Sequence, residues 1–139
     1  EKEIRSLAVA EKVSPIATVP EVRNFVDKKL REFGRMKRIV MDGRDIGTTV
    51  FPDAELKIFM TADTDIRAER RAAEMRAKGE EADIETVKKN LLERDYIDSH
   101  RETSPLSKAE DAIVLDNSHM TMEDQVEWIK GIIAERFGC

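Results

Sequence analysis

Residues 42–45 place two acids and an arginine directly after a short apolar run. The run, residues 39–41, predicts a buried strand, and Arg44 and Asp45 stand at its exit. In open α/β sheets ligands bind beyond the carboxyl ends of the strands, and guanidinium and carboxylate groups are suited to binding anions and hydrogen-bonding ligands there. Gly43 and Gly47 allow the close backbone approaches that such a loop needs. On these residues alone, a turn with a surface ion pair of little energetic value stays open as the alternative.

The helix predicted for residues 83–100 has one face that changes from apolar to charged along its length. At helical spacing, that face carries in order Ile84, Val87, Leu91, Arg94, Asp98 and Arg101. We interpret the change as a helix that runs from the core into an anion-binding cleft, with Asp98 reducing the repulsion between the arginines. The alternative is a helix whose end emerges into solvent.

A second group of arginines lies on the helix predicted for residues 64–78. It comprises Arg67, Arg70, Arg71 and Arg76, and glutamates are interspersed among them. Pairs at i,i+4 spacing on a solvated helix face explain such a pattern without any ligand, and we prefer that explanation for Arg67 and Arg76. For Arg70 and Arg71, phosphate binding stays equally open.

These residues need strands and helices to position them. The apolar pattern predicts strands at 38–42, 56–60 and 112–115, and helices at 64–78, 83–100 and 121–137. A further helix after Thr18 has Pro20 in its first turn and ends at Gly34, and a break at Ser14-Pro15 precedes it. Its apolar stripe is Val22, Val26, Leu30 and Phe33, and the stripe of the last helix is Met122, Val126, Ile129, Ile133 and Phe137. Strands that alternate with helices indicate an α/β fold with a parallel sheet.

The composition limits the classes of protein that fit. The 139 residues include 24 Lys+Arg and 29 Asp+Glu and are 40% apolar, which is typical of a soluble globular domain. The net charge of −5 argues against nucleic acid as the main partner. The sequence has no apolar run of membrane-spanning length, and its single cysteine leaves no intrachain disulfide, so we expect a cytoplasmic protein.

No glycine-rich phosphate-binding sequence, G-x-x-x-x-G-K-[S/T] or G-x-G-x-x-G, occurs in the chain. Three strands are also few for a parallel sheet that must be buried on both faces. We therefore expect the chain to be part of a longer protein.

Three stretches of sequence carry a family resemblance. They are DGRDIGTTVFPDAELKIFMTA (42–62), RAERR (67–71) and ERDYIDSHRETSPLSKAEDAIVLD (93–116), and together they resemble the bacterial cytidylate kinases. The likeness runs from residue 3 to the C-terminus. It implies a three-layer P-loop kinase-like parallel sheet with flanking helices, incomplete because the N-terminal strand and phosphate loop, in roughly the first two fifths of a family member, are absent. Within the single domain 1–139, residues 1–34 would end the monophosphate-binding region, 35–62 hold core strands, about 63–83 form a lid, and 84–139 complete the core.

The resemblance also implies roles for individual residues. Cytosine presents an amino donor beside two acceptors, and a carboxylate and a guanidinium complement that edge. The residues that correspond to the cytosine-recognising groups are Ser14, Arg23 and Asp45. Those that correspond to the phosphate-gripping, catalytic arginines are Arg44, Arg94 and Arg101, and Asp98 corresponds to a carboxylate that contacts the sugar. Arg70 and Arg71 fall in the lid over the ATP phosphates, residues 116–118 lie by the adenine, and Asp42 lies near Mg²⁺, indirectly through water.

The implied activity is transfer of the γ-phosphoryl group of ATP to CMP or dCMP, with Mg²⁺, by a monomer that binds neither nucleic acid nor membrane. No nucleophile or general base is needed, because the acceptor phosphate is already an anion. We expect these 139 residues alone to be inactive. The alternative is a catalytically dead module that binds nucleotide or phosphate, or that serves an interaction.

Overall fold

The computed structural model describes residues 7–138, and the side chains of five residues in the first helix, Ser14 among them, are outside the description. The chain divides into two compact units, each made of two separate stretches. The first contains residues up to Lys57 and Lys89–Ala112, and the second contains Ile58–Lys88 and residues from Ile113 onward. None of the helices in the described part of the chain is both long enough and apolar enough to cross a membrane.

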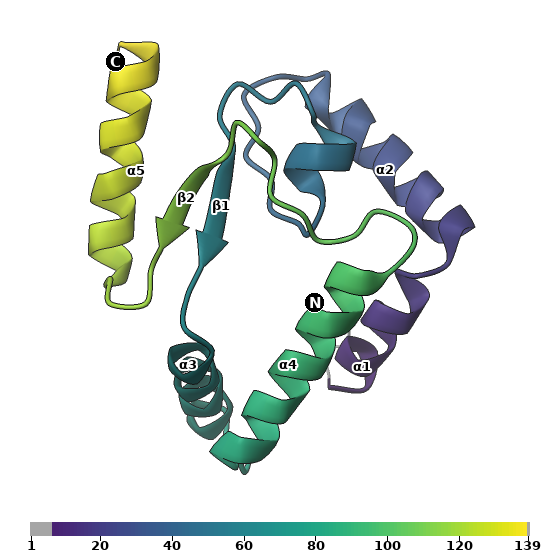
Figure 1. Ribbon diagram of the computed structural model, residues 1–139, viewed down its shortest axis with the longest axis vertical. Helices are drawn as coiled ribbons and strands as arrows, with labels where there is room; N and C mark the ends of the chain where they lie inside the picture. Colours follow the sequence, from purple (N-terminus) through teal and green to yellow (C-terminus); the bar gives the residue numbers. More distant parts are fainter. Residues whose placement is uncertain (1–6, 139) are drawn as a thin grey trace. The chain divides into compact units, whose positions relative to one another are not determined.

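The second unit contains the sheet. Strands β1 (Ile58–Thr61) and β2 (Ile113–Asp116) pair in parallel, with Ile58 opposite Ile113 and Thr61 opposite Asp116 (Figure 1). Helix α3 (Thr64–Ala77) follows β1 and fully buries Ala68 and Ala72. Both strands begin one or two residues later than the sequence predicts. The α/β class and the parallel pairing are confirmed.

Helix α5 (Met122–Phe137) begins where its sequence predicts. The Thr121 hydroxyl accepts a hydrogen bond from the Asp124 backbone N–H, and the Asp124 carboxylate accepts one from the Thr121 N–H, which is a capping box. The predicted apolar stripe does not become core, since Met122, Val126, Ile133 and Phe137 are all exposed and Gln125 is the buried position. Two paired strands present too little apolar surface to cover the whole stripe.

The first unit begins with two helices, α1 (Leu7–Ile16) and α2 (Pro20–Gly34). The predicted break at Ser14-Pro15 is wrong, because α1 includes Pro15 in its last turn. The Thr18 hydroxyl donates to the Pro15 carbonyl at 2.7 Å, so it satisfies a helix-end carbonyl and does not cap α2. The N-cap of α2 is instead Val19, with Pro20 at the first helical position.

The strand predicted at residues 38–42 does not form in the described structure. Lys37 and Arg38 adopt positive φ angles of 62° and 55°, and the Val40 side chain is fully exposed. A strand is stabilised by the hydrogen-bond ladder to a neighbour, and within residues 7–138 the only ladder joins β1 to β2. The prediction of a strand at residues 38–42 is therefore wrong.

Residues 46–50 instead coil into η2 (Ile46–Val50), a single π-helical turn. The Asp45 carbonyl accepts hydrogen bonds from the N–H groups of Thr48, Thr49 and Val50 at 2.9–3.3 Å. The Arg31 guanidinium of α2 donates to the carbonyls of Thr49 and Val50, which holds η2 against that helix. Single π turns of this kind are frequent at functional sites.

Helix α2 buries its polar side rather than its predicted apolar stripe. Val22, Val26 and Phe33 are exposed, whereas Asp27 is only 4% exposed. At its end, Gly34 lies directly against the Phe51 ring. Helix α2 thus packs through charged side chains and a glycine contact.

Helix α4 (Ile84–His100) begins after Asp83, whose carboxylate accepts hydrogen bonds from the N–H and hydroxyl of Thr86. Along the face predicted from the sequence, Val87 and Asp98 are both buried. Ile84 is 38% exposed and the Arg94 side chain is 50% exposed, so the predicted face is buried only in part. The buried end of that face, at Asp98 and Arg101, is charged as predicted. The alternative, a helix end that emerges into solvent, is wrong.

The contact between Gly34 and Phe51 predicts a stability effect. A Cβ on Gly34 overlaps ring atom Cε1 of Phe51, so Gly34→Ala should destabilise the natural protein by about 1–3 kcal/mol in urea unfolding. Gly131, within α5, has nothing near the corresponding Cβ position, so Gly131→Ala should stabilise by roughly 0.5–1 kcal/mol. If both alanines stabilise the protein, Gly34 is not under packing constraint.

Candidate functional site

Asp45 is the N-cap residue of η2 and is 4% exposed. Its two carboxylate oxygens face two different arginines. Oδ2 accepts a hydrogen bond from Arg23 Nη2 of α2 at 2.5 Å, and Oδ1 lies 3.5 Å from Arg101 Nη2. Asp45 therefore connects α2 to the segment that follows α4.

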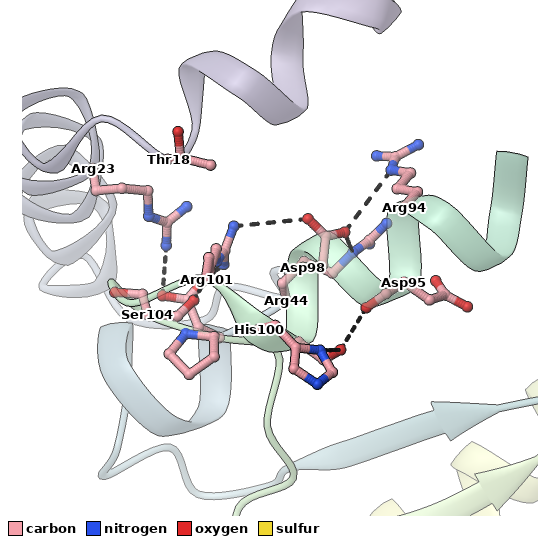
Figure 2. A network of polar contacts seen from close by, with 12 residues as sticks. Thr18, Arg23, Arg44, Arg94, Asp95, Asp98, His100, Arg101 and Ser104 are labelled. Carbon is pink, nitrogen blue, oxygen red and sulfur yellow. Dashed lines mark hydrogen bonds and ion pairs between the residues drawn. The ribbon is translucent and has the colours of Figure 1, made fainter.

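Asp98, near the end of α4, is the second buried carboxylate. Its Oδ2 accepts a hydrogen bond from Arg44 Nε at 2.8 Å and lies 3.9 Å from Arg94 Nε, and its Oδ1 lies 3.9 Å from Arg101 Nη1. Figure 2 shows Arg94 and Arg101 directed toward this carboxylate. Three arginines thus converge on Asp98, which reduces their mutual repulsion as the sequence predicts.

Arg101 links the two carboxylates. Its side chain is 5% exposed, and one of its terminal nitrogens faces Asp45 while the other faces Asp98. Its Nε donates to the Ser104 carbonyl at 2.6 Å (Figure 2). Ser104 adopts a positive φ of 53°, and the Leu106 N–H donates to the Asp98 carbonyl at 2.7 Å. The chain after α4 therefore folds back around Arg101.

Exposure rises across this cluster. Arg101 and Arg23 are 5% and 14% exposed at their side chains, whereas Arg44 and Arg94 are 42% and 50% exposed. The buried arginines are engaged by carboxylates, and the exposed ones keep donors that face solvent. With Asp27, the cluster contains four arginines and three aspartates, so it carries one net positive charge and can attract an anion.

Six of the site residues predicted from the sequence come together here: Arg23, Arg44, Asp45, Arg94, Asp98 and Arg101. Arg44 pairs with Asp98 and Asp45 with Arg23, so the isolated Arg44–Asp45 surface pair is ruled out as the explanation of that loop. The Ser14 side chain lies outside the description. Asp42 is an exposed residue ahead of η2, and residues 7–138 hold no group of three or more His, Cys, Asp or Glu side chains that could bind a metal.

Sequence reasoning missed two charged residues in this unit, Asp27 and Arg31. Asp27 Oδ1 lies 3.4 Å from Arg23 Nη2, one helical turn away, and Arg31 holds η2. The i,i+4 spacing of Arg23 and Asp27 is a recognisable pairing signal. The apolar stripe, which lies on a neighbouring face of α2, is the more prominent pattern in the sequence.

The second unit has its own polar cluster, at the exits of β1 and β2. The Ser118 hydroxyl donates to Asp116 at 2.6 Å and accepts from the Asp63 N–H at 2.9 Å, which ties the two strand exits together. Asn117 donates to the Gln125 side chain of α5 at 3.0 Å. Since parallel strands end at the same edge, this is the edge where ligands bind in α/β sheets.

Arg70 of α3 joins that cluster. It donates to the Asn117 side chain at 3.0 Å, to the Asn117 carbonyl at 2.7 Å and to the Ser118 carbonyl at 3.3 Å. Arg71, by contrast, pairs with Glu74 on the exposed face of α3 at 2.9 Å. The two arginines that sequence reasoning treated alike therefore have different surroundings, and Arg70 fixes the loop after β2.

The parallel strands joined through helices define an α/β protein, and its arginine–aspartate cluster is suited to binding an anionic ligand. The cytidylate kinase family model matches residues 1–135, so the chain belongs to the cytidylate kinase family. Membership places it in the P-loop kinase fold, of which the chain shows a part.

Curated relatives agree with the family model. The chain is 60% identical over 129 residues to a cytidylate kinase of Parabacteroides distasonis, which covers 93% of the chain and 56% of that relative. It is 54% identical over 138 residues to one of Bacteroides thetaiotaomicron, covering 99% of the chain and 58% of the relative. A cytidylate kinase of Flavobacterium johnsoniae is 55% identical over 125 residues. The chain thus spans little more than half the length of the curated relatives it matches.

The Asp116 cluster predicts a pH dependence of stability. Hydrogen bonds from the Ser118 hydroxyl and backbone N–H lower the pKa of Asp116. A lowered folded-state pKa stabilises the fold above the unfolded-state value of about 3.9, and this stabilisation is lost as the pH falls through the folded-state pKa. Asp116→Asn should therefore flatten the loss of stability between about pH 5 and pH 2, measured by urea unfolding of the natural protein.

Ser118→Ala removes one of the two hydrogen-bond donors to Asp116. It should also flatten the loss of stability at acid pH, by a smaller amount than Asp116→Asn. If stability of the natural protein and of both variants falls in parallel with pH, the hydrogen bonds to Asp116 do not contribute in this way.

Proposed function

We propose that the natural protein containing this chain is a cytidylate kinase, which transfers the γ-phosphoryl group of ATP to CMP or dCMP and so produces CDP or dCDP. The observation that carries the proposal is the arginine–aspartate cluster of the first unit, in which six predicted substrate residues lie together. The relatives named cytidylate kinase, at 54–60% identity, support the same activity.

Recognition of the base is assigned to Arg23 and Asp45. Asp45 keeps lone pairs beyond those that face Arg23 and Arg101, so it can accept from the amino group of cytosine. Arg23 uses one terminal nitrogen on Asp45 and keeps other donors for the ring nitrogen and carbonyl of the base. Ser14 is assigned to the same task by family resemblance.

Binding of the substrate phosphate is assigned to Arg44, Arg94 and Arg101, and contact with the sugar to Asp98. Phosphoryl transfer depends chiefly on positioning and on neutralising the charge of the transferring group. The exposed guanidinium groups of Arg44 and Arg94 supply donors to the phosphate, while buried Arg101 fixes the two carboxylates that orient the cluster.

On the ATP side, Arg70 and Arg71 are assigned to a lid over the phosphates, and the loop at residues 116–118 is assigned to the adenine end. Mg²⁺ typically binds substrate phosphates, waters and one or two carboxylates, and exposed Asp42 fits a water-mediated role of that kind. The bound ion would neutralise phosphate charge. We further propose a single domain with the boundaries given above, acting as a cytoplasmic monomer without nucleic acid or membrane partners.

A coupled assay of ADP release from ATP, with CMP as acceptor, tests the proposal on the natural full-length protein. Robust turnover with CMP and dCMP supports a kinase. If the protein binds CMP in calorimetry but shows no turnover, the alternative of a catalytically dead nucleotide-binding module is correct.

The 139 residues alone should show no CMP-dependent ADP release in that assay, because they contain no glycine-rich phosphate-binding sequence. Turnover by this chain at a rate comparable to the full-length protein would contradict the assignment of ATP binding to a separate phosphate loop.

Arg94→Ala in the natural protein should lower kcat/KM for CMP by about 100-fold or more, because a charged donor to the phosphate is lost. The side chain is half exposed, so the melting temperature should change little. Lys89→Ala is the matched control, since Lys89 is a 76% exposed cation on the same helix. An Arg94→Ala variant as active as the Lys89→Ala control would refute the role of Arg94.

A further inference from the structure

Asp27 is a buried acid that the substrate roles above do not use. It lies in the middle of α2, its side chain is 5% exposed, and its Oδ1 is 3.4 Å from Arg23 Nη2. Among the residues that the structure describes, that oxygen has no hydrogen-bond partner, and neither does Arg23 Nε, which is also buried. Asp27 and Arg23 are thus buried side by side, and each has one polar atom without a hydrogen bond in the described structure.

Stability alone would not favour a buried aspartate at this position of α2. Burying a carboxylate costs free energy unless it is fully paired, and an apolar residue of similar volume often serves stability as well or better. Helix α2 nevertheless leaves Val22 and Val26 exposed while it buries Asp27. Departures of this kind from local rules are expected at functional positions.

The geometry around Arg23 indicates what Asp27 does. Arg23 Nη2 is close to two carboxylates, 2.5 Å from Asp45 Oδ2 and 3.4 Å from Asp27 Oδ1. A guanidinium that faces a single carboxylate favours a bidentate pair, which would engage both Asp45 oxygens. Asp27, a second carboxylate 3.4 Å from the same nitrogen, competes for that nitrogen and restrains the guanidinium to a single contact with Asp45. Asp45 then keeps the capacity to accept a hydrogen bond from a ligand.

We propose that Asp27 is a positioning residue that holds Arg23 in the orientation required to select a pyrimidine with an exocyclic amino group over one with a carbonyl at the same position. This inference rests on the proposed function. Cytosine donates from its amino group where uracil presents an acceptor, so selection depends on an Asp45 that is free to accept. Asp27 acts through Arg23 and does not touch the substrate.

The test compares Asp27→Leu, Asp27→Asn and Asp27→Glu in the natural full-length protein, with kcat and KM measured for CMP and for UMP at saturating ATP. In the Leu and Asn variants the KM for CMP should rise about tenfold or more, and the preference for CMP over UMP in kcat/KM should fall by a similar factor. The kcat for CMP should stay within about twofold of the unmodified protein, because the phosphate-binding arginines are unchanged. Asp27→Glu should restore part of the preference.

Asp27→Leu separates positioning from stability, because it removes the buried charge and fills the space. A Leu variant that is at least as stable as the unmodified protein yet loses selectivity supports the inference. Glu32→Gln is the matched control, an acid on the same helix that pairs with Lys29 instead, and it should leave kcat, KM and selectivity unchanged.

Two results would overturn the inference while leaving the proposed function intact. The first is unchanged KM and selectivity in folded Asp27→Leu and Asp27→Asn variants. The second is an equal fall in kcat/KM for both nucleotides together with a lowered melting temperature, which marks a structural role only. Absence of CMP turnover in the unmodified protein would refute the proposed function, and this inference with it.

Discussion

Two buried carboxylates, Asp45 and Asp98, set the arrangement of the first unit. Each is about 4% exposed, and a buried charge must be paired to be tolerated. Arg101 faces both, so the η2 turn and the end of α4 must meet at its guanidinium. Arg23 then fixes α2 to the same point through Asp45. Ion pairs, rather than the packing of apolar side chains, hold these elements together. The same ion pairs therefore fix the orientation of the polar groups in the folded protein.

The pairing with Asp45 and Asp98 explains why some arginines of the cluster are buried and others are exposed. The inner arginines are held by carboxylates, and the outer ones, Arg44 and Arg94, share Asp98 yet reach solvent. Donors positioned before a ligand arrives need no reorganisation when charge develops on it, which is how preorganised electrostatic sites accelerate reactions. A cluster with one net positive charge suits a phosphate on a small nucleotide better than a long polyanion. The sequence likeness to cytidylate kinases and the physical character of the site therefore agree.

Local patterns in the sequence predicted the local features well. The capping box at Thr121 and Asp124, helices α3 to α5, the parallel pairing and six cluster residues all follow from spacing and family motifs. Features that depend on distant partners were not predictable. Residues 38–42 have strand composition, but a strand needs a ladder partner, and residues 7–138 supply none there. The burial of Asp27 in place of the α2 valines is likewise set by packing between elements. The π-helical turn η2, which Arg31 of α2 contacts, has no simple sequence signal.

The proposed function requires that the Arg23–Asp45 pair contacts the base while Arg44 and Arg94 hold the phosphate. A crystal structure of the natural protein with bound CMP tests it directly. We expect the cytosine amino group within about 3 Å of an Asp45 carboxylate oxygen and the phosphate in contact with Arg44 and Arg94. A CMP molecule bound with its phosphate away from these arginines, or with its base remote from Asp45, would show that the cluster is not the CMP site.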